Sequence, residues 1–450
     1  MNFRKSKHSV STKGNSLSSL WRLPLVEVGL GGAMVIAAYF GRQGTTVTAS
    51  TKELMGLFCA LVIAYGIKSP FAPIYCWAFI TPIYPAFGFS IALIGGAVFT
   101  IVCSAKKRLW RWNFSGFGMV FCFWGIVSLS WGDKLDLSQT GFFATTLPGM
   151  FLAVIVAGIR DSHFRRNLAV ILILSISIGC CETIHSWFSG ISFTDYAEDM
   201  EYLASGRCPS FIQPDTFSSW CLFGGLSMLA FLIDKIKFPS AAWIGGALVL
   251  LLIMVGIVLS GYRSTILAIA LSSAVMLLLT GRKKTAFFAI SLATLAILLG
   301  SFNLGLFDLV GKRFETIQED GGSGRLEIWH GAAQIFINHP IVGIGWDNFH
   351  FAIEEYFGQQ MLPHNLYLQS FVELGFIGGV LNIIWIIHFC KKAWNAADRV
   401  WIIPILVAYL FQGFFLGQNF YLYFWLAIGC AENSSLHAHK MLRRPANKPQ

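Results

Sequence analysis

Charged residues are scarce in this chain of 450 residues: they make up 12% of the sequence, whereas 55% of the residues are hydrophobic. Soluble globular domains carry about a quarter charged residues. The mean hydropathy is +0.62, and apolar runs near the ~20 residues that cross a bilayer recur along the whole chain. This composition excludes a soluble globular domain and predicts an all-α polytopic membrane protein.

Several motifs that mark other classes of protein are also missing. No C-x-x-C pair occurs among the ten cysteines, so neither a zinc site nor a disulfide framework is indicated. The chain has no P-loop, no H-E-x-x-H and no G-x-S-x-G. The spacing of His330, His339, His350 and His364 matches no zinc motif. We expect no metal, no cofactor and no use of ATP, so any chemistry must use energy already stored in the substrate.

Apolar runs predict about fourteen membrane spans. The second span and the pair over 71–104 could be re-entrant or merged. About twelve spans would then remain. Both counts return the C-terminus to the side of the N-terminus. The predicted spans are 23–40, 53–67, 71–86, 88–104, 114–131, 140–158, 167–188, 216–234, 241–259, 262–280, 285–306, 366–390, 399–417 and 419–431.

The basic residues indicate the orientation of these spans. If the N-terminus lies in the cytoplasm, 25 of the 33 lysines and arginines fall in cytoplasmic segments, as the positive-inside rule requires. We therefore predict a multi-pass protein with both termini cytoplasmic. Its parts are a basic N-terminus at 1–22, a bundle at 23–306 with an outer loop at 189–215, a large outer loop at 307–365, the last helices at 366–431 and a basic tail at 432–450.

The large outer loop has the pattern of a folded lid. In GRLEIWHGAAQIFINHP, apolar residues recur at nearly helical spacing until Pro340 ends the run. Trp329 and Phe336 suit a helix that lies at the headgroups. We expect the loop to pack over the mouths of the helices.

Arginines on the outer side have no role in setting topology, and four of them stand in patterned segments: Arg207, Arg263, Arg313 and Arg325. A guanidinium matches the geometry of phosphate and keeps its charge, so these residues could bind a lipid diphosphate. The alternative is that they reach to lipid headgroups. His364 lies in the large outer loop that also holds Arg325. It could deprotonate a hydroxyl group, although a loop histidine is more often a surface residue.

A polar row follows His364 inside an otherwise apolar helix. Asn365, Gln369 and Glu373 are spaced four residues apart, which places them on one face. Asn365 is expected to cap the helix that begins at Leu366. Glu373, an ionisable group within a span, either lines a cavity or makes a structural hydrogen bond to a neighbour.

Three of these segments resemble one bacterial family in their residues and in their order. LSGYRST (259–265), SGRLEIWHGAAQIFINHPIVGIGWDNF (323–349) and PHNLYLQSFVELGFIGG (363–379) resemble the superfamily of O-antigen ligases and Wzy-type polysaccharide polymerases. RCPSFIQPDTF (207–217) resembles an upstream element of that superfamily, with Ser210 and Asp215 in place of the usual Gly and Asn.

The resemblance implies a fold and an activity. It implies a GT-C-like, metal-independent membrane glycosyltransferase of the bacterial inner membrane, which moves a glycan from a polyprenyl diphosphate carrier to an acceptor at the periplasmic face. Arg207, Arg263 and Arg325 would bind the diphosphate, and His364 would be the catalytic residue, as the base or as a residue on the acceptor side. Asn365, Gln369 and Glu373 would line the cavity. A growing polysaccharide as acceptor would make the protein an exopolysaccharide or O-antigen polymerase, and lipid A core would make it a ligase.

A function without bond chemistry remains open on the sequence alone. A transporter or flippase of lipid-linked glycans would also place arginines in a cavity. Unlike a transferase, it would not depend on a single histidine.

Overall fold

The structure is a computed structural model of the whole chain. It describes residues 25–40, 42–43, 46–47, 49–83, 87–104, 109–132, 146–161, 163–190, 207–208, 210–233, 240–280, 325–396, 398–416 and 421–442. The span predicted at 285–306 and most of the loop predicted at 189–215 lie outside the described residues.

The described part of the chain is a bundle of helices, with one hairpin of two-residue strands, β1 (Arg42–Gln43) and β2 (Thr46–Val47). This confirms an all-α membrane protein. The helices are α1 (Leu25–Phe40), α2 (Ala49–Gly66), α3 (Ala72–Ile80), α4 (Phe87–Cys103), α5 (Gly116–Ser128), α6 (Leu147–Gly158), α7 (Phe164–Ser189), α9 (Pro214–Ile233), α10 (Ser240–Leu259), α11 (Arg263–Leu279), α14 (Arg325–Asn338), α15 (Phe349–Phe357), α16 (Leu366–Trp394), α17 (Arg399–Gln412) and α18 (Leu422–Leu442).

Three of these helices, α7, α9 and α16, are long and apolar enough to cross a membrane. Eight more stretches of the described chain are apolar but shorter. The total of twelve to fourteen spans therefore stays a prediction. In place of the span predicted at 71–86, the structure has the shorter helix α3. It has nine residues, and all of them are buried. Nine helical residues rise about 14 Å, which is half of a hydrocarbon core, so α3 fits the re-entrant alternative.

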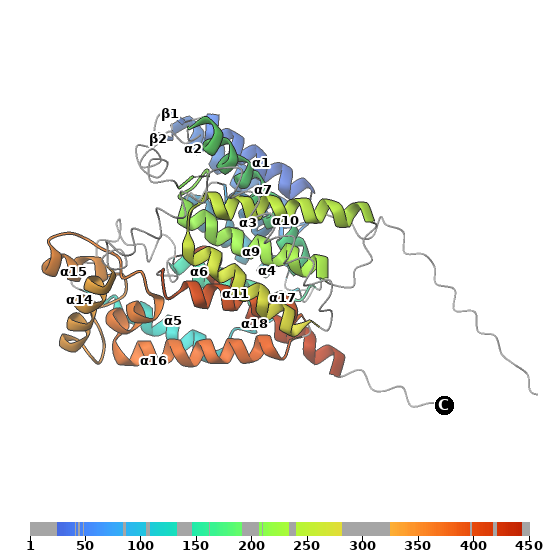
Figure 1. Ribbon diagram of the computed structural model, residues 1–450. Coiled ribbons are helices and arrows are strands. Elements are labelled where there is room, and N and C mark those ends of the chain that lie inside the picture. Colours follow the sequence, from blue (N-terminus) through green and yellow to red (C-terminus); the bar gives the residue numbers. More distant parts are fainter. Residues whose placement is uncertain are drawn as a thin grey trace, which may run out of the picture.

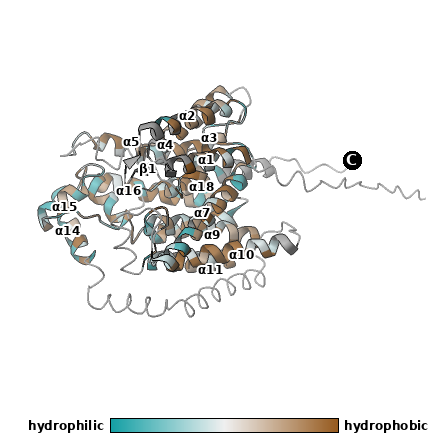
Figure 2. Cartoon of the chain, turned by 90° about the horizontal axis from the view of Figure 1, so that it is seen from above, coloured by the Kyte–Doolittle hydropathy of each residue, from teal (hydrophilic) through white to brown (hydrophobic). Residues whose placement is uncertain are grey.

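The helices of the predicted outer loop lie at one end of the bundle. In the bundle α6 packs on α18, α11 on α17, and α10 on α7 and α9. Helices α14 and α15 lie at the end of the bundle where α16 begins, whereas α18 ends on the opposite side (Figure 1). Seen from above, α14 and α15 carry more hydrophilic residues than the largely hydrophobic α10 and α11 (Figure 2). The outer loop predicted at 307–365 thus contains helices. Its residues 325–365 are described, and residues 325–364 are called the lid below.

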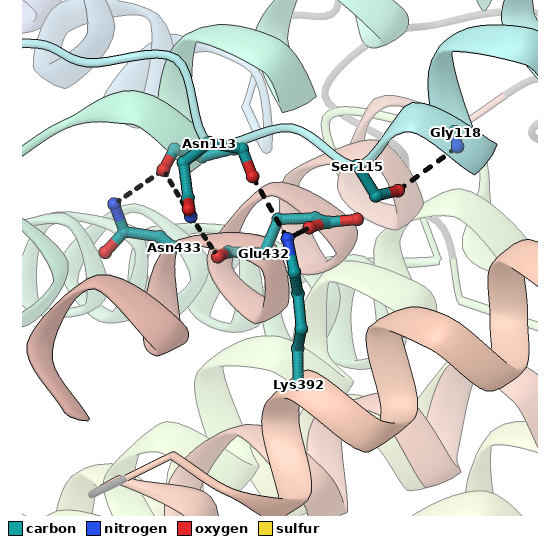
Figure 3. A network of polar contacts seen from close by, with 7 residues as sticks. Asn113, Ser115, Gly118, Lys392, Glu432 and Asn433 are labelled. Atoms are coloured by element: carbon teal, nitrogen blue, oxygen red, sulfur yellow. Dashed lines mark hydrogen bonds and ion pairs between the residues drawn. The ribbon is translucent and has the colours of Figure 1, made fainter. Parts of the chain in front are cut away.

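Far from the lid, a polar network joins four segments of the chain (Figure 3). The ammonium of Lys392, on α16, pairs with the fully buried Glu432 of α18 and donates to the carbonyl of Asn113 at 3.1 Å. The Asn113 side chain donates to the carbonyl of Glu432, at 2.5 Å, and Asn433 donates to the carbonyl of Ile159, at 2.7 Å. These contacts join α16, α18 and the segments that precede α5 and follow α6.

We expect Lys392→Met to destabilise the protein by about 3–5 kcal/mol, because it leaves the carboxylate of Glu432 buried without its cation. The neighbouring Lys391→Met is the matched control, since Lys391 is exposed. Thermal unfolding of the purified protein measures both. A second change, Glu432→Leu in the Lys392→Met background, should recover part of the loss; equal midpoints for the Lys392 and Lys391 variants would contradict the expectation.

Candidate active site

The turn between α10 and α11 positions the first arginines. Gly261 adopts a φ of 69°, a conformation that favours glycine, so the chain reverses within three residues and α11 starts at Arg263. The backbone N–H of Cys208 donates to the carbonyl of Leu259 at 2.9 Å. This bond fastens the segment that carries Arg207 to the same turn.

Tyr262, directly before Arg263, lies beside a second arginine. The guanidinium of Arg207 lies over the Tyr262 ring, 5.5 Å from its centroid. Burial lowers the pKa of Arg325 from its ordinary value; Tyr262 opposes this shift, and the charges of Arg263 and Arg207 add to it. The three arginines predicted from the sequence are therefore close enough to act on one another, although they come from three segments of the chain. The sequence reasoning did not single out Tyr262, although it stands directly before Arg263.

The lid brings Arg325 to His364. Arg325 and Trp329 lie one turn apart on α14, and the Trp329 indole donates to the carbonyl of Pro363 at 3.0 Å. The Arg325 guanidinium lies 5.9 Å from the centroid of the Phe415 ring. Residue 364 is thus held beside the first turn of α14.

His364 has both strained backbone and a shifted pKa. Its φ of 45° lies in the left-handed region, which a non-glycine residue adopts at a cost of about 1–3 kcal/mol, often at functional sites. Burial lowers the pKa of His364 to about 4, and the positive charge of Arg325 contributes to the shift. The imidazole is therefore neutral near pH 7 and able to accept a proton.

The polar row after His364 has two different roles in the structure. Asn365 caps α16, as predicted: its side-chain oxygen accepts from the backbone N–H groups of Tyr367 and Leu368, both at 3.0 Å. Gln369 and Glu373 are buried, and the Gln369 amide donates to the Glu373 carboxylate at 3.1 Å.

Glu373 faces the lid. Its carboxylate accepts hydrogen bonds from the backbone N–H groups of Asp347 and Phe349, and its backbone carbonyl accepts from the N–H of Gly345 at 2.8 Å. Asp347 is itself buried and has a φ of 62°. These contacts favour the structural alternative for Glu373, as an anchor for the lid.

A break in α16 makes room for that anchor. Gly375 has a φ of 67° and a ψ of −172° in the middle of the helix. The N–H groups of Phe376 and Ile377 donate to the carbonyls of Pro340 and Ile341, at 2.8 and 3.3 Å. The backbone of 340–345 therefore completes the hydrogen bonding that the break opens, and we call this contact the lid joint.

Residues 246–383 match the family model described as O-antigen ligase. This part of the chain is similar to O-antigen ligases. The match confirms the resemblance to the superfamily of O-antigen ligases and Wzy-type polymerases, and it covers Arg263, Arg325, His364 and the whole lid joint. Arg207 lies upstream of the matched residues. A comparison with curated proteins found no match to the chain.

Proposed function

We propose that this O-antigen ligase-type protein transfers a glycan from a polyprenyl diphosphate carrier to an acceptor at the periplasmic face of the bacterial inner membrane. The observation that carries the proposal is the grouping of three arginines from separate segments, next to a histidine that is neutral at pH 7. Guanidinium groups neutralise a diphosphate and stabilise it as a leaving group. A neutral imidazole beside them can take up a proton.

In the proposed reaction, a hydroxyl of the acceptor attacks the anomeric carbon of the donor glycan. His364 takes the hydroxyl proton while the bond between the sugar and the diphosphate breaks. The negative charge that develops on the departing diphosphate is stabilised by Arg207, Arg263 and Arg325. The residues supply all the charge that this scheme needs, so no metal enters it. The acceptor is a growing polysaccharide or a lipid A core.

The direct test incubates the purified protein with a polyprenyl-diphosphate oligosaccharide and each class of acceptor. Formation of a longer glycan supports a polymerase, and transfer to the lipid A core supports a ligase. Movement of the lipid-linked glycan across vesicles, without a new glycosidic bond under any condition, would instead identify a transporter.

Arg263→Lys should lower the rate of transfer strongly, although it keeps the positive charge. An ammonium lacks the planar fork that binds two phosphate oxygens together. The measurement is the transfer rate at matched protein levels, and Arg399→Lys is the control, since Arg399 lies at the start of α17 outside the arginine group. Full activity of the Arg263 variant would argue against diphosphate binding at this site.

Substrate binding should raise the pKa of His364. In the free protein burial lowers that pKa and the positive charge of Arg325 lowers it further, and a bound diphosphate would offset this charge. The protonated imidazole cannot act as a base, so activity should fall as the pH falls through the pKa. We expect the acid limb of kcat/KM, which reports the free enzyme, near pH 4, and the acid limb of kcat at a higher pH. Identical acid limbs would contradict this coupling.

A further inference from the structure

The lid has an apolar edge at its base. Ile337 at the end of α14 is 63% exposed, Ile341 is 65% exposed, and Phe376 just past the break in α16 is 60% exposed. Val342 and Ile377 are exposed as well. We call these five residues the lid base. Residues 337–342 include no Asp, Glu, Lys or Arg.

The lid joint makes this edge one continuous surface. Phe376 and Ile377 donate their backbone N–H groups to Pro340 and Ile341, so the chain after α14 lies directly against α16 at these positions. A second pair of bonds, from Ile344 to Val372 and from Gly345 to Glu373, holds the same segment on the other side of Gly375. The exposed side chains of the lid are thus fixed next to those of α16.

The edge continues a surface that faces lipid. Beyond Phe376 and Ile377, helix α16 exposes Ile383, Ile384 and Ile387, which follow at helical spacing along one side. Helix α16 is long and apolar enough to span a membrane, so the acyl chains of the bilayer cover this stripe. The lid base extends the stripe towards the lid without an intervening charged residue.

We propose that the lid base is inserted into the hydrocarbon of the leaflet on the side where α16 begins. The lid is then a membrane-anchored element rather than a domain held in water above the bundle. Its occupant is the acyl chains of bilayer lipids, because the surface is continuous with the lipid-facing stripe of α16. This inference concerns the seating of the lid and does not depend on glycan transfer.

The seating sets the depth of the candidate active site. Leu366, the first residue of α16, lies nine helical residues before the break at Gly375, and nine helical residues rise about 14 Å. With Phe376 among acyl chains, His364 and Arg325 come to the headgroup level on the same side. The phosphates of membrane lipids lie at that level, so an anionic headgroup reaches the arginines without leaving the bilayer.

The test places a small fluorescent amino acid, dansylalanine, at Ile341 of the full-length protein in lipid nanodiscs. Nitroxide groups on the lipid acyl chains quench fluorophores in the hydrocarbon, and iodide quenches those in water. Ile384→dansylalanine is the lipid-facing reference, and Gln359→dansylalanine, at an exposed polar position of the lid, is the reference in water. Ile337→dansylalanine gives a second reading of the lid base.

We expect both lid-base probes to behave as the Ile384 probe does: quenched by the acyl-chain nitroxides and shielded from iodide. Quenching by iodide as strong as at Gln359 would overturn the proposal. Shielding from both quenchers, with two copies of the chain in each disc, would also overturn it and would assign the surface to a second copy. All four labelled proteins are compared at matched thermal midpoints, so loss of folding cannot imitate either result.

Discussion

Replacing His364 with alanine is expected to abolish detectable glycan transfer while donor binding persists. A general base contributes typically 10²–10⁴-fold to a rate, and a loss of that size is the expected result. Binding is proposed to rest on the arginines instead, whose positions depend on the turn before α11 and on α14 rather than on the imidazole. The measurements are the transfer rate and the affinity for the lipid-linked donor.

His330→Ala is the matched control for this experiment. His330 is exposed on α14, so it shares the lid and the residue type but lies away from the proton that His364 is proposed to accept. It should keep the rate of the unaltered protein. A fully active His364→Ala variant would remove the proposed base and would favour the transporter alternative.

The second large effect is expected from Gly375→Ala, which should break the contact between the lid and α16. The backbone of Gly375 lies in a region open essentially to glycine alone, and an alanine held there costs about 1–3 kcal/mol. A Cβ atom at Gly375 would also lie 2.2 Å from the carbonyl oxygen of Ile341, in the backbone of the lid joint. Because neither backbone segment can yield without breaking the joint, we expect a loss of about 3 kcal/mol or more together with loss of transfer.

Gly245→Ala tests whether this effect belongs to the joint. Gly245 lies in α10, and a Cβ atom there meets nothing within 4 Å. Alanine in a helix is favoured over glycine, so this variant should be at least as stable as the unaltered protein. Protease accessibility of the lid and thermal unfolding distinguish the two variants. A Gly375→Ala protein with a protected lid and full activity would show that the joint is dispensable.

Helix Leu366–Trp394 has features that the local sequence predicts and one feature that depends on tertiary packing. Its apolar run predicts a span over 366–390, and the cap at Asn365 follows from the residue type at a helix start; the structure has both. The break at Gly375 was not predicted. A glycine inside an apolar helical run is compatible with a straight helix, and only the approach of Pro340 and Ile341 decides that the backbone opens there.

The lid likewise combines a helix that the local sequence predicts with contacts that depend on tertiary packing. Helical spacing from Arg325 onward and a stop near Pro340 predict α14, which ends at Asn338. The sequence leaves the role of Glu373 open between a cavity and a structural bond. The hydrogen bonds of its carboxylate to the backbone of Asp347 and Phe349 come from packing, because the partners are separated by more than twenty residues.

The sequence by itself determined the class of protein, the apolar helix that begins at Leu366, the lid helix and the arginines and histidine to consider, because hydropathy, helix caps and residue chemistry are local properties. Tertiary structure alone decided that Arg207 lies over the Tyr262 ring, that burial and the charge of Arg325 lower the pKa of His364, and that Lys392 pairs with Glu432. Each of these contacts joins segments that are distant along the chain. Their distances depend on how the helices pack, which no local pattern of residues encodes.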